Sequence, residues 1–391
     1  MRALAQGLKR AGVCAGFFAC CQAPPALGAA SGNQQRVSSV LEMVVIPGVE
    51  KLEISTLKLS RNVRDWCAAE SDRANENEPA ANGVRTKAYA ALTDAFRETA
   101  AAWGGVEFLR FGPLVTKGRR ERFAFWPDPR GVMARQLRQV LAAKDPALLE
   151  PGALVMQSAA VQGLPALEYL IVSVAGTQKA GGALSAAEGD DQGYRCKLAV
   201  AVGGNLASLA HEIRQEWTKD GGYRQMMLDT GPDHRIYKTD TEAAADLVRS
   251  LLTGLQVIAD AQAKPRTSGA AAVQSATPPG AEKTNGPFSR IAAEPAYFAG
   301  ATHALKALYD GLDMEASLAP DKHWMKGWAA GAWRAILQSG GVGGAAKGVP
   351  TRSTPSPREV AGRINGLRQL IGREMANAAG IPIGFNELDG D

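Results

Sequence analysis

Apolar residues recur at three- and four-residue intervals along most of this chain, a spacing that places them on one face of an α-helix. The clearest stripes lie within residues 37–68, 86–108, 131–143, 194–217, 239–262, 298–312, 321–339 and 360–375. No stretch shows the strict apolar–polar alternation of a half-buried strand. The pattern therefore predicts an all-α fold. Antiparallel helices with connections of this kind pack into bundles, so we expect two of them.

A change in composition separates the two expected bundles. Ala263–Pro287 is rich in Ala, Pro, Ser, Thr and Gly and has no apolar period, which is typical of a linker. We therefore predict an N-terminal bundle over residues 35–262, a linker over residues 263–287 and a C-terminal bundle over residues 288–391.

The chain is organised around the apolar segment Ala153–Val174, which has the length of a buried helix and is too long for a strand. Pro165 lies in its middle. A proline there has no N–H to donate and clashes with the carbonyl group four residues earlier, so we expect the helix to kink or break. Glu168 follows among leucines. A carboxylate in such surroundings must be paired, ligated or protonated.

Two interpretations of Glu168 are open from the sequence. Either it is a satisfied carboxylate in a kinked core helix, or the kink opens the bundle and Glu168 points at a ligand. At about 100° per residue, eleven residues return to within roughly 20° of the starting direction, so Gln157 would share the face of Glu168. Gln162 would lie about a third of a turn away. Both amides are therefore candidate ligand-binding residues beside Glu168.

Two neighbouring stretches add candidate residues. Glu107 follows Trp103 by four residues and flanks the apolar stripe of its helix. It is either a second carboxylate near the core or a helix-end residue paired with Arg110. Residues 111–130 hold glycines and prolines among aromatic residues that need burial, and loops that pack aromatic side chains often border sites. We expect Glu168 to face a pocket lined by residues 103–113 and by residues 125–128, which include Trp126 and Asp128.

Four short stretches, in their order along the chain, resemble the imelysin-like family. Gly163-Leu-Pro165-Ala-Leu-Glu168-Tyr-Leu is similar to the family signature, which reads Gly-x-His-x-x-Glu followed by Tyr-Leu-Leu. The other matches are Trp103 through Glu107 to Pro113, which resembles a Trp…Glu…Phe-Gly-Pro stretch, Phe125–Asp128, which resembles a Trp-Pro segment, and Gly384–Asp391, which resembles a Gly-Phe-Asn-x-x-Asp-Gly-Asp ending. Gly163, Pro165, Trp103 and Trp126 form the scaffold of these motifs.

The resemblance implies two helical-bundle domains with the signature site near their interface, a place in the cell envelope and a link to iron uptake. The family is also classed among the peptidases. One departure matters: the motif histidine of the family is Pro165 here, which has no side chain that binds a metal or transfers a proton. A hard cation such as Fe³⁺ prefers oxygen ligands. Glu168 with Glu107 or Asp128 is therefore the candidate set for iron or another divalent or trivalent cation.

The N-terminus has the pattern of an export signal over residues 1–30. A basic beginning with Arg2, Lys9 and Arg10 precedes a short apolar core, and small residues follow it. Cys20 follows Phe-Phe-Ala, so a lipid anchor at this cysteine is the alternative to soluble export. No later segment has enough uninterrupted apolar residues to span a membrane. We therefore expect a periplasmic or cell-envelope protein.

Two cysteines remain after the predicted leader, Cys67 and Cys196. An even number in an oxidising compartment indicates a disulfide. The alternative is two buried thiols, which behave as small apolar groups.

Composition and motifs exclude several classes of function. The apolar fraction of 46% allows a sizeable core. The net charge of +5 comes mainly from scattered Lys and Arg, and no nucleic-acid-binding motif accompanies it. No His-Glu-x-x-His zinc motif, serine nucleophile elbow or phosphate loop is present.

The hypothesis that remains is a non-catalytic cell-envelope binding protein linked to iron or metal uptake, with a metal ion, another small ligand or an envelope protein as partner. The alternatives are a metallopeptidase-like hydrolase and a structural or partner-binding bundle. Three or more acidic groups around Glu168 would favour a metal site, whereas Glu168 paired with an arginine would favour a structural role.

Overall fold

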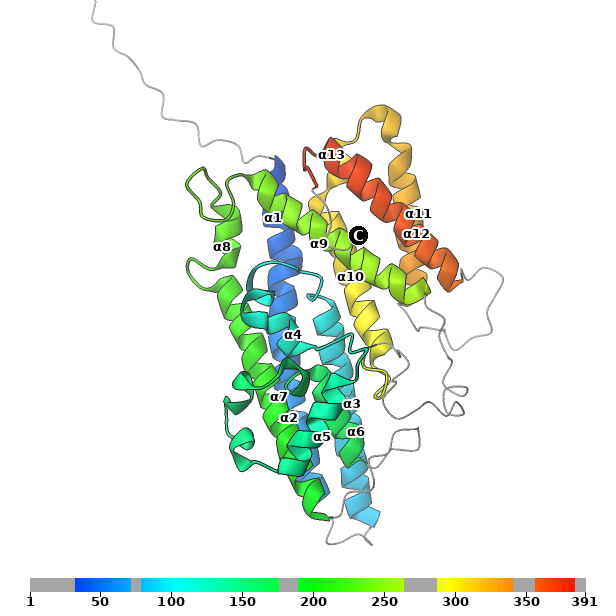
Figure 1. The fold of residues 1–391 in the computed structure, drawn as a ribbon. Helices are drawn as coiled ribbons and strands as arrows, with labels where there is room; N and C mark the ends of the chain where they lie inside the picture. Colours follow the sequence, from blue (N-terminus) through cyan, green and yellow to red (C-terminus); the bar gives the residue numbers. More distant parts are fainter. Residues whose placement is uncertain (1–31, 72–78, 176–188, 264–286, 340–355, 384–391) are drawn as a thin grey trace, which may run out of the picture.

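The structure, a computed structural model, describes residues 32–71, 79–175, 189–263, 287–339 and 356–383. Within these ranges every regular element is helical (Figure 1), which confirms the all-α prediction. The leader with Cys20, nearly all of the predicted linker and the C-terminal stretch 384–391 lie outside the described residues. None of the described helices is long and apolar enough to cross a membrane.

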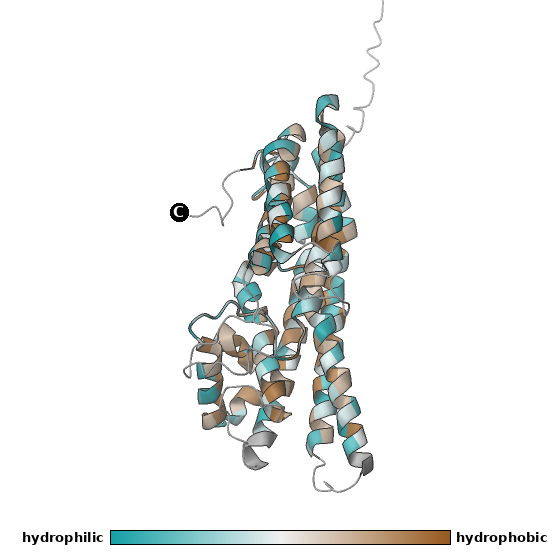
Figure 2. Ribbon diagram, turned by 90° about the vertical axis from the view of Figure 1, so that its right-hand side faces the viewer, coloured by the Kyte–Doolittle hydropathy of each residue, from teal (hydrophilic) through white to brown (hydrophobic). Residues whose placement is uncertain are grey.

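One group of helices is built on α2, which packs against both α3 and α7 (Figure 1). The shorter helix α6 covers α7, and α5 contacts both α6 and α7. The bounds are α2 Ile46–Ser71, α3 Pro79–Gly104, α5 Val132–Ala143, α6 Leu164–Val174 and α7 Gly189–Thr218. Each long helix carries hydrophobic and hydrophilic residues along its length, as the apolar stripes predict (Figure 2).

A second group is built on α9, which packs against α12, α10 and α1 (Figure 1). The helix α11 lies on α12 and also contacts α10. The bounds are α1 Gly32–Val40, α9 Asp240–Ala263, α10 Glu294–Leu312, α11 Trp324–Gln338 and α12 Pro357–Leu370. Helices from before the predicted linker thus pack against helices that follow it. The domain boundaries given above stay a prediction.

The first long helix takes part in both groups. α1 continues through a π-helical turn, Leu41–Val45, directly into α2. The π turn ends just before Pro47, and π turns are one established cause of irregular helices.

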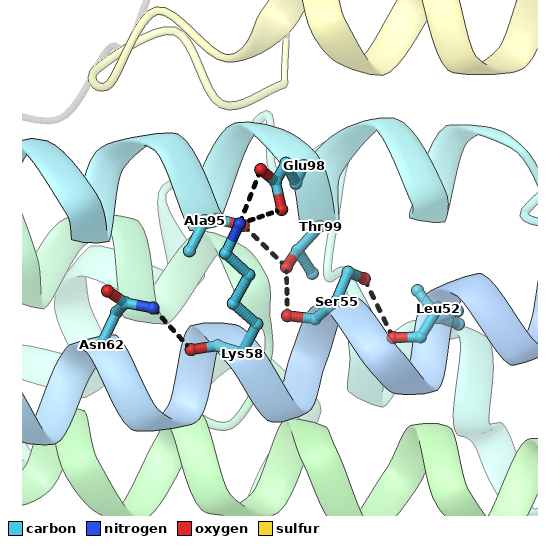
Figure 3. Close-up of polar contacts among 7 residues, drawn as sticks. All are labelled: Leu52, Ser55, Lys58, Asn62, Ala95, Glu98 and Thr99. Carbon is cyan, nitrogen blue, oxygen red and sulfur yellow. Dashed lines mark hydrogen bonds and ion pairs between the residues drawn. The ribbon is translucent and has the colours of Figure 1, made fainter.

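Polar contacts fix α3 against α2 (Figure 3). The Thr99 hydroxyl donates hydrogen bonds to the carbonyl oxygens of Ser55, at 3.1 Å, and of Ala95, at 2.9 Å. An ion pair between Lys58 and Glu98, with Nζ and Oε2 2.7 Å apart, lies at the surface. These contacts position the C-terminal end of α3, which leads into the candidate site.

The disulfide ties α2 to α7. Cys67 and Cys196 are bonded in the structure, with Cα atoms 5.6 Å apart, which is the usual separation for a disulfide. This agrees with the pairing expected from the sequence.

The segment Ala153–Val174 is not the single helix that we predicted. Two 3₁₀ turns, Ala153–Met156 and Ala159–Val161, come first, and α6 begins only at Leu164. Pro165 lies in the first turn of α6, where a helix needs no N–H and the fixed φ of proline is favourable. The proline therefore starts a helix here. Because Gln157 precedes the helix, the shared face expected for it with Glu168 does not exist.

Candidate functional site

Glu168 lies on α6 with its side chain 1% exposed. Its Oε2 accepts a hydrogen bond from Nη1 of Arg290 at 3.2 Å. Its Oε1 accepts one from the backbone N–H of Ile291 at 3.1 Å. Both partners belong to the turn that precedes α10. Glu168 therefore joins α6 to the part of the chain that follows the predicted linker.

Opposing effects act on the charge of Glu168. Burial raises the pKa of its carboxyl above the ordinary value, while the Arg290 guanidinium and the Ile291 N–H lower that pKa by a smaller amount. Arg290 is 27% exposed and its guanidinium carbon lies 5.9 Å from the ring centroid of Tyr169. The cation of this pair is thus near the surface, and the carboxylate is fully enclosed.

Gly163 precedes α6 at a point where there is no room for a side chain. A Cβ atom there would lie 2.7 Å from the carbonyl oxygen of Phe123 and 2.8 Å from that of Arg122. The first residue of the signature is therefore required by the close approach of α4, Arg119–Phe123, to the start of α6.

Gln162 holds the same junction with its buried side chain. Its Oε1 accepts a hydrogen bond from Nε of Arg122 at 3.1 Å, and its Nε2 donates to the carbonyl oxygen of Gln157 at 2.7 Å. Asn205 of α7 donates to the Gln162 carbonyl oxygen at 3.1 Å. The Gln157 residue is exposed and contributes a main-chain oxygen. The two candidate amides thus stabilise the backbone before α6.

The aromatic loop packs beside this junction. Trp103 stacks on Phe123 with ring centroids 4.3 Å apart and planes 16° apart, and both side chains are buried. Trp126 is half-buried. Asp128 accepts hydrogen bonds from the backbone N–H groups of Val132 at 2.9 Å and Met133 at 2.8 Å. Its carboxylate therefore caps the N-terminus of α5.

Glu107 accepts a hydrogen bond from the hydroxyl group of Tyr297 on α10. Burial, together with the Glu107 charge, raises the pKa of Tyr297 well above its ordinary value. Both residues line a small cavity where α3, α9 and α10 meet, and Arg110 lines it too. The helices approach closely here, because a Cβ on Gly104 would lie 2.2 Å from the Tyr297 carbonyl oxygen.

The candidate residues therefore occupy separate environments. The pocket expected in front of Glu168 is replaced by direct contact with Arg290 and Ile291, and Asp128 serves α5 instead. The sequence did not single out Arg290, Ile291 or Tyr297 as site residues. They lie far along the chain from their partners. The one sequence feature that could have pointed to any of them is the position of Tyr297, directly before the apolar stripe of residues 298–312.

The residues around Glu168 do not fit a metal ion. The family's histidine position is occupied by Pro165, and the nearest charged partner is a guanidinium, which cannot ligate a cation. Across the described ranges, no group of three or more His, Cys, Asp or Glu residues is placed to hold a metal.

The fold and the site together define the class of protein. It is an all-helical protein in which a Gly-x-Pro-x-x-Glu sequence begins a helix that packs against the turn before α10. The family model for imelysin, described as Peptidase_M75, matches residues 45–320. The chain therefore belongs to the imelysin family. A solved structure of an imelysin-like protein from Psychrobacter arcticum 273-4 has a similar fold, with a TM-score of 0.63, 18% identity and coverage of 92% of this chain and 98% of that one. No curated protein matched the chain.

Proposed function

We propose that this chain is an exported, non-catalytic binding protein of the cell envelope. The observation that carries the proposal is the state of Glu168, whose two oxygens accept hydrogen bonds from Arg290 and Ile291 inside the protein. A general base or a metal ligand needs a lone pair directed at the substrate or the metal. Both oxygens are directed at the protein itself, which favours a structural role for the signature helix. This supports the non-catalytic part of the proposal, and the binding role rests on the family resemblance.

Export is supported by the sequence of residues 1–30, with Cys20 as the site of a lipid anchor in the alternative form. The disulfide between Cys67 and Cys196 agrees with an oxidising compartment. Together these features support the proposal that the protein works outside the cytoplasm, in the periplasm or attached to the envelope.

The family resemblance extends the proposal to iron or metal uptake. Because the residues at Glu168 do not fit a cation, we place such a role in the recognition of a ligand or of an envelope partner protein. One alternative is a metallopeptidase-like hydrolase, which would need a metal-bound water or another activated nucleophile. This alternative rests on the family resemblance alone. A structural bundle without a small ligand is the other alternative.

The test is metal analysis and peptidase assay of protein purified from its native compartment, as wild type, Glu168→Gln and Pro165→His. We expect wild type to carry far less than one metal ion per chain, and Glu168→Gln to have the same metal content. We also expect wild type to hydrolyse peptides no faster than the Glu168→Gln variant. A stoichiometric metal that Glu168→Gln releases would overturn the proposal in favour of a metal site. Hydrolysis lost in that variant would favour the hydrolase.

Pro165→His restores the family's motif next to Glu168. If this substitution alone raises metal affinity, loss of the histidine explains why the wild-type site does not fit a cation. A variant that still binds no metal would show that Arg290, and not only the missing imidazole, excludes cations from this position.

A further inference from the structure

The outer side of α11 exposes two tryptophans on neighbouring turns. Trp324 is 62% exposed and Trp328 is 42% exposed, whereas four other tryptophans of the chain are at most 1% exposed. The opposite side of α11 packs against α12 and α10, at the edge of the molecule (Figure 1). Neighbouring exposed indole rings are typical of a surface that contacts another molecule.

Two glycines lie on the same side of α11 as these rings. Trp324, Gly327, Trp328 and Gly331 have the i, i+3, i+4, i+7 spacing of one helix side. A Cβ atom on either glycine would meet nothing within 4 Å. Glycine weakens a helix relative to alanine, and packing within the described residues does not require it here. Both glycines leave room for another backbone or ring to approach α11 closely.

The Trp328 ring is held in place by α12. A Cβ on Gly366 would lie 2.7 Å from Cη2 of Trp328, so the ring lies directly against the helix backbone at this glycine. A side chain that is already fixed loses little conformational entropy when a partner binds. The exposed edge of Trp328 is therefore prepared for a contact.

The order of these residues is complementary to itself. A two-fold axis opposite the bond between Gly327 and Trp328 would place a second copy of α11 antiparallel to the first. Trp324, three residues before Gly327, would then lie over Gly331 of the second copy, three residues after Trp328. The same contact would form again at the other end, because a two-fold interface repeats each contact. A bulky ring thus meets a gap twice.

The charges at the two ends of this surface are complementary as well. Asp321 lies six residues before Gly327, and Arg334 lies six residues after Trp328. Both are exposed, and the antiparallel arrangement brings each next to the opposite charge of the second copy. A parallel arrangement would bring like charges together instead. Lys326 lies two residues from each tryptophan and therefore points to the opposite side of α11.

We propose that this surface binds a second copy of the chain, through antiparallel packing of α11 against α11. Each copy contributes little more than one helix, which is at the lower end of interface sizes, so we expect a dissociation constant on the order of micromolar. The dimer goes beyond the proposed function and does not involve Glu168.

The first experiment is analytical ultracentrifugation of the full mature chain from about 1 to about 200 µM, a range that covers weak dimers. We expect a reversible monomer–dimer equilibrium. Trp324→Ser should weaken the dimer by about tenfold or more, because interface tryptophans carry much of the binding free energy. Ile54→Ser is the matched control, since Ile54 is 66% exposed on α2 and lies outside the surface. It should leave the equilibrium unchanged.

A charge exchange tests the pairing of the two ends. Asp321→Arg alone and Arg334→Asp alone should each weaken the dimer by about tenfold, because each creates two repulsive contacts. The double variant Asp321→Arg, Arg334→Asp should return the dissociation constant to within about threefold of wild type. Asp65→Arg, at an exposed position of α2, should have no effect. Circular dichroism checks that each variant is folded.

Cysteine cross-linking tests the direction of packing. Gly327→Cys lies next to its own counterpart across the axis, so mild oxidation should yield a disulfide-linked dimer. The two copies of Gly331 would be separated by about 10 Å along the helix, so Gly331→Cys should link far more slowly. Gly83→Cys on α3, where a Cβ also meets nothing within 4 Å, is the control and should not link.

The proposal is overturned if wild type stays monomeric throughout the concentration range. It is also overturned if Trp324→Ser matches wild type, if the charge exchange does not restore the dimer, or if Gly331→Cys links as fast as Gly327→Cys. A monomer that binds phosphatidylglycerol vesicles through Trp324 would assign the surface to a membrane instead. The metal and peptidase assays at Glu168 do not affect these results, so the two proposals fail independently.

Discussion

Arg290 donates a hydrogen bond to Glu168 across 122 residues of sequence, and the two partners are exposed to very different extents. The Glu168 side chain is 1% exposed, whereas that of Arg290 is 27% exposed. A buried carboxylate cannot exchange its partner for water, but a guanidinium near the surface can. The pair is therefore asymmetric, and the two partners should respond differently to substitution.

We expect Arg290→Gln to destabilise the protein far more than Glu168→Gln at pH 7. Without Arg290, the buried carboxyl loses its charged partner, and removing one member of a buried ion pair costs about 3–5 kcal/mol. Glu168→Gln keeps the shape of the side chain and an acceptor for the Ile291 N–H, and water can reach the Arg290 guanidinium. We therefore expect Glu168→Gln to lower the free energy of unfolding by about 1 kcal/mol. Urea denaturation of both variants measures the difference. Equal losses would show that the pair acts symmetrically.

The stability contributed by Glu168 should fall as pH rises. Burial raises the pKa of its carboxyl above the ordinary value. Between the ordinary and the raised pKa, the folded chain binds more protons than the unfolded chain, so the free energy of unfolding decreases with increasing pH in that range. Glu168→Gln does not titrate and serves as the reference.

Wild type should accordingly be most stable, relative to Glu168→Gln, near pH 4. Its advantage should shrink as pH rises from about 4.5, towards the difference of about 1 kcal/mol expected at pH 7. Denaturant titrations of both proteins from pH 4 to pH 7.5 test this. A relative stability that increases with pH would mean that Arg290 outweighs burial and that the carboxyl pKa is lowered.

The sequence predicted the helices well because each one depends on its own apolar stripe. The helices Val132–Ala143 and Trp324–Gln338 lie close to their predicted ranges. The error over Ala153–Val174 has a local cause: a continuous apolar run does not reveal whether a proline interrupts a helix or begins one. Here Gly163 permits the close approach of α4, and Pro165 starts the helix after it.

The site was less predictable because its partners come from distant parts of the chain. The sequence identified Glu168 as a carboxylate that must be paired, but it could not choose between a cation, a pocket and an arginine. Arg290 lies beside the predicted linker, in a stretch with no helical pattern. Only the packing of the turn before α10 against α6 brings it to Glu168.

Mass spectrometry of the mature protein should show that the leader has been removed. The basic beginning, short apolar core and small residues before Ala30 predict cleavage near Ala29 or Ala30. A lipidated Cys20 at the new N-terminus is the expected alternative. An intact Met1 on the envelope form would refute both outcomes.

Loss of the disulfide should lower stability without changing the fold. Cys67 and Cys196 are 129 residues apart in sequence, and closing a loop of this length contributes at most about 5 kcal/mol in the chain-entropy model. The double variant Cys67→Ala, Cys196→Ala should unfold at lower urea concentration and should not respond to reductant, whereas wild type should. A non-reducing peptide map that recovers both thiols free in wild type would remove the basis of this expectation.

Gly163→Ala should destabilise the protein. The new Cβ would lie 2.7 Å from the Phe123 carbonyl oxygen, so the start of α6 or the end of α4 must move, at a cost of about 1–3 kcal/mol. Gly331→Ala is the matched control, because a Cβ there meets nothing within 4 Å. Inside α11 it should stabilise the protein by about 0.5–1 kcal/mol through helix propensity. Thermal and urea unfolding of the two variants gives opposite signs if backbone contact, and not chain flexibility, requires glycine at the first position of the signature.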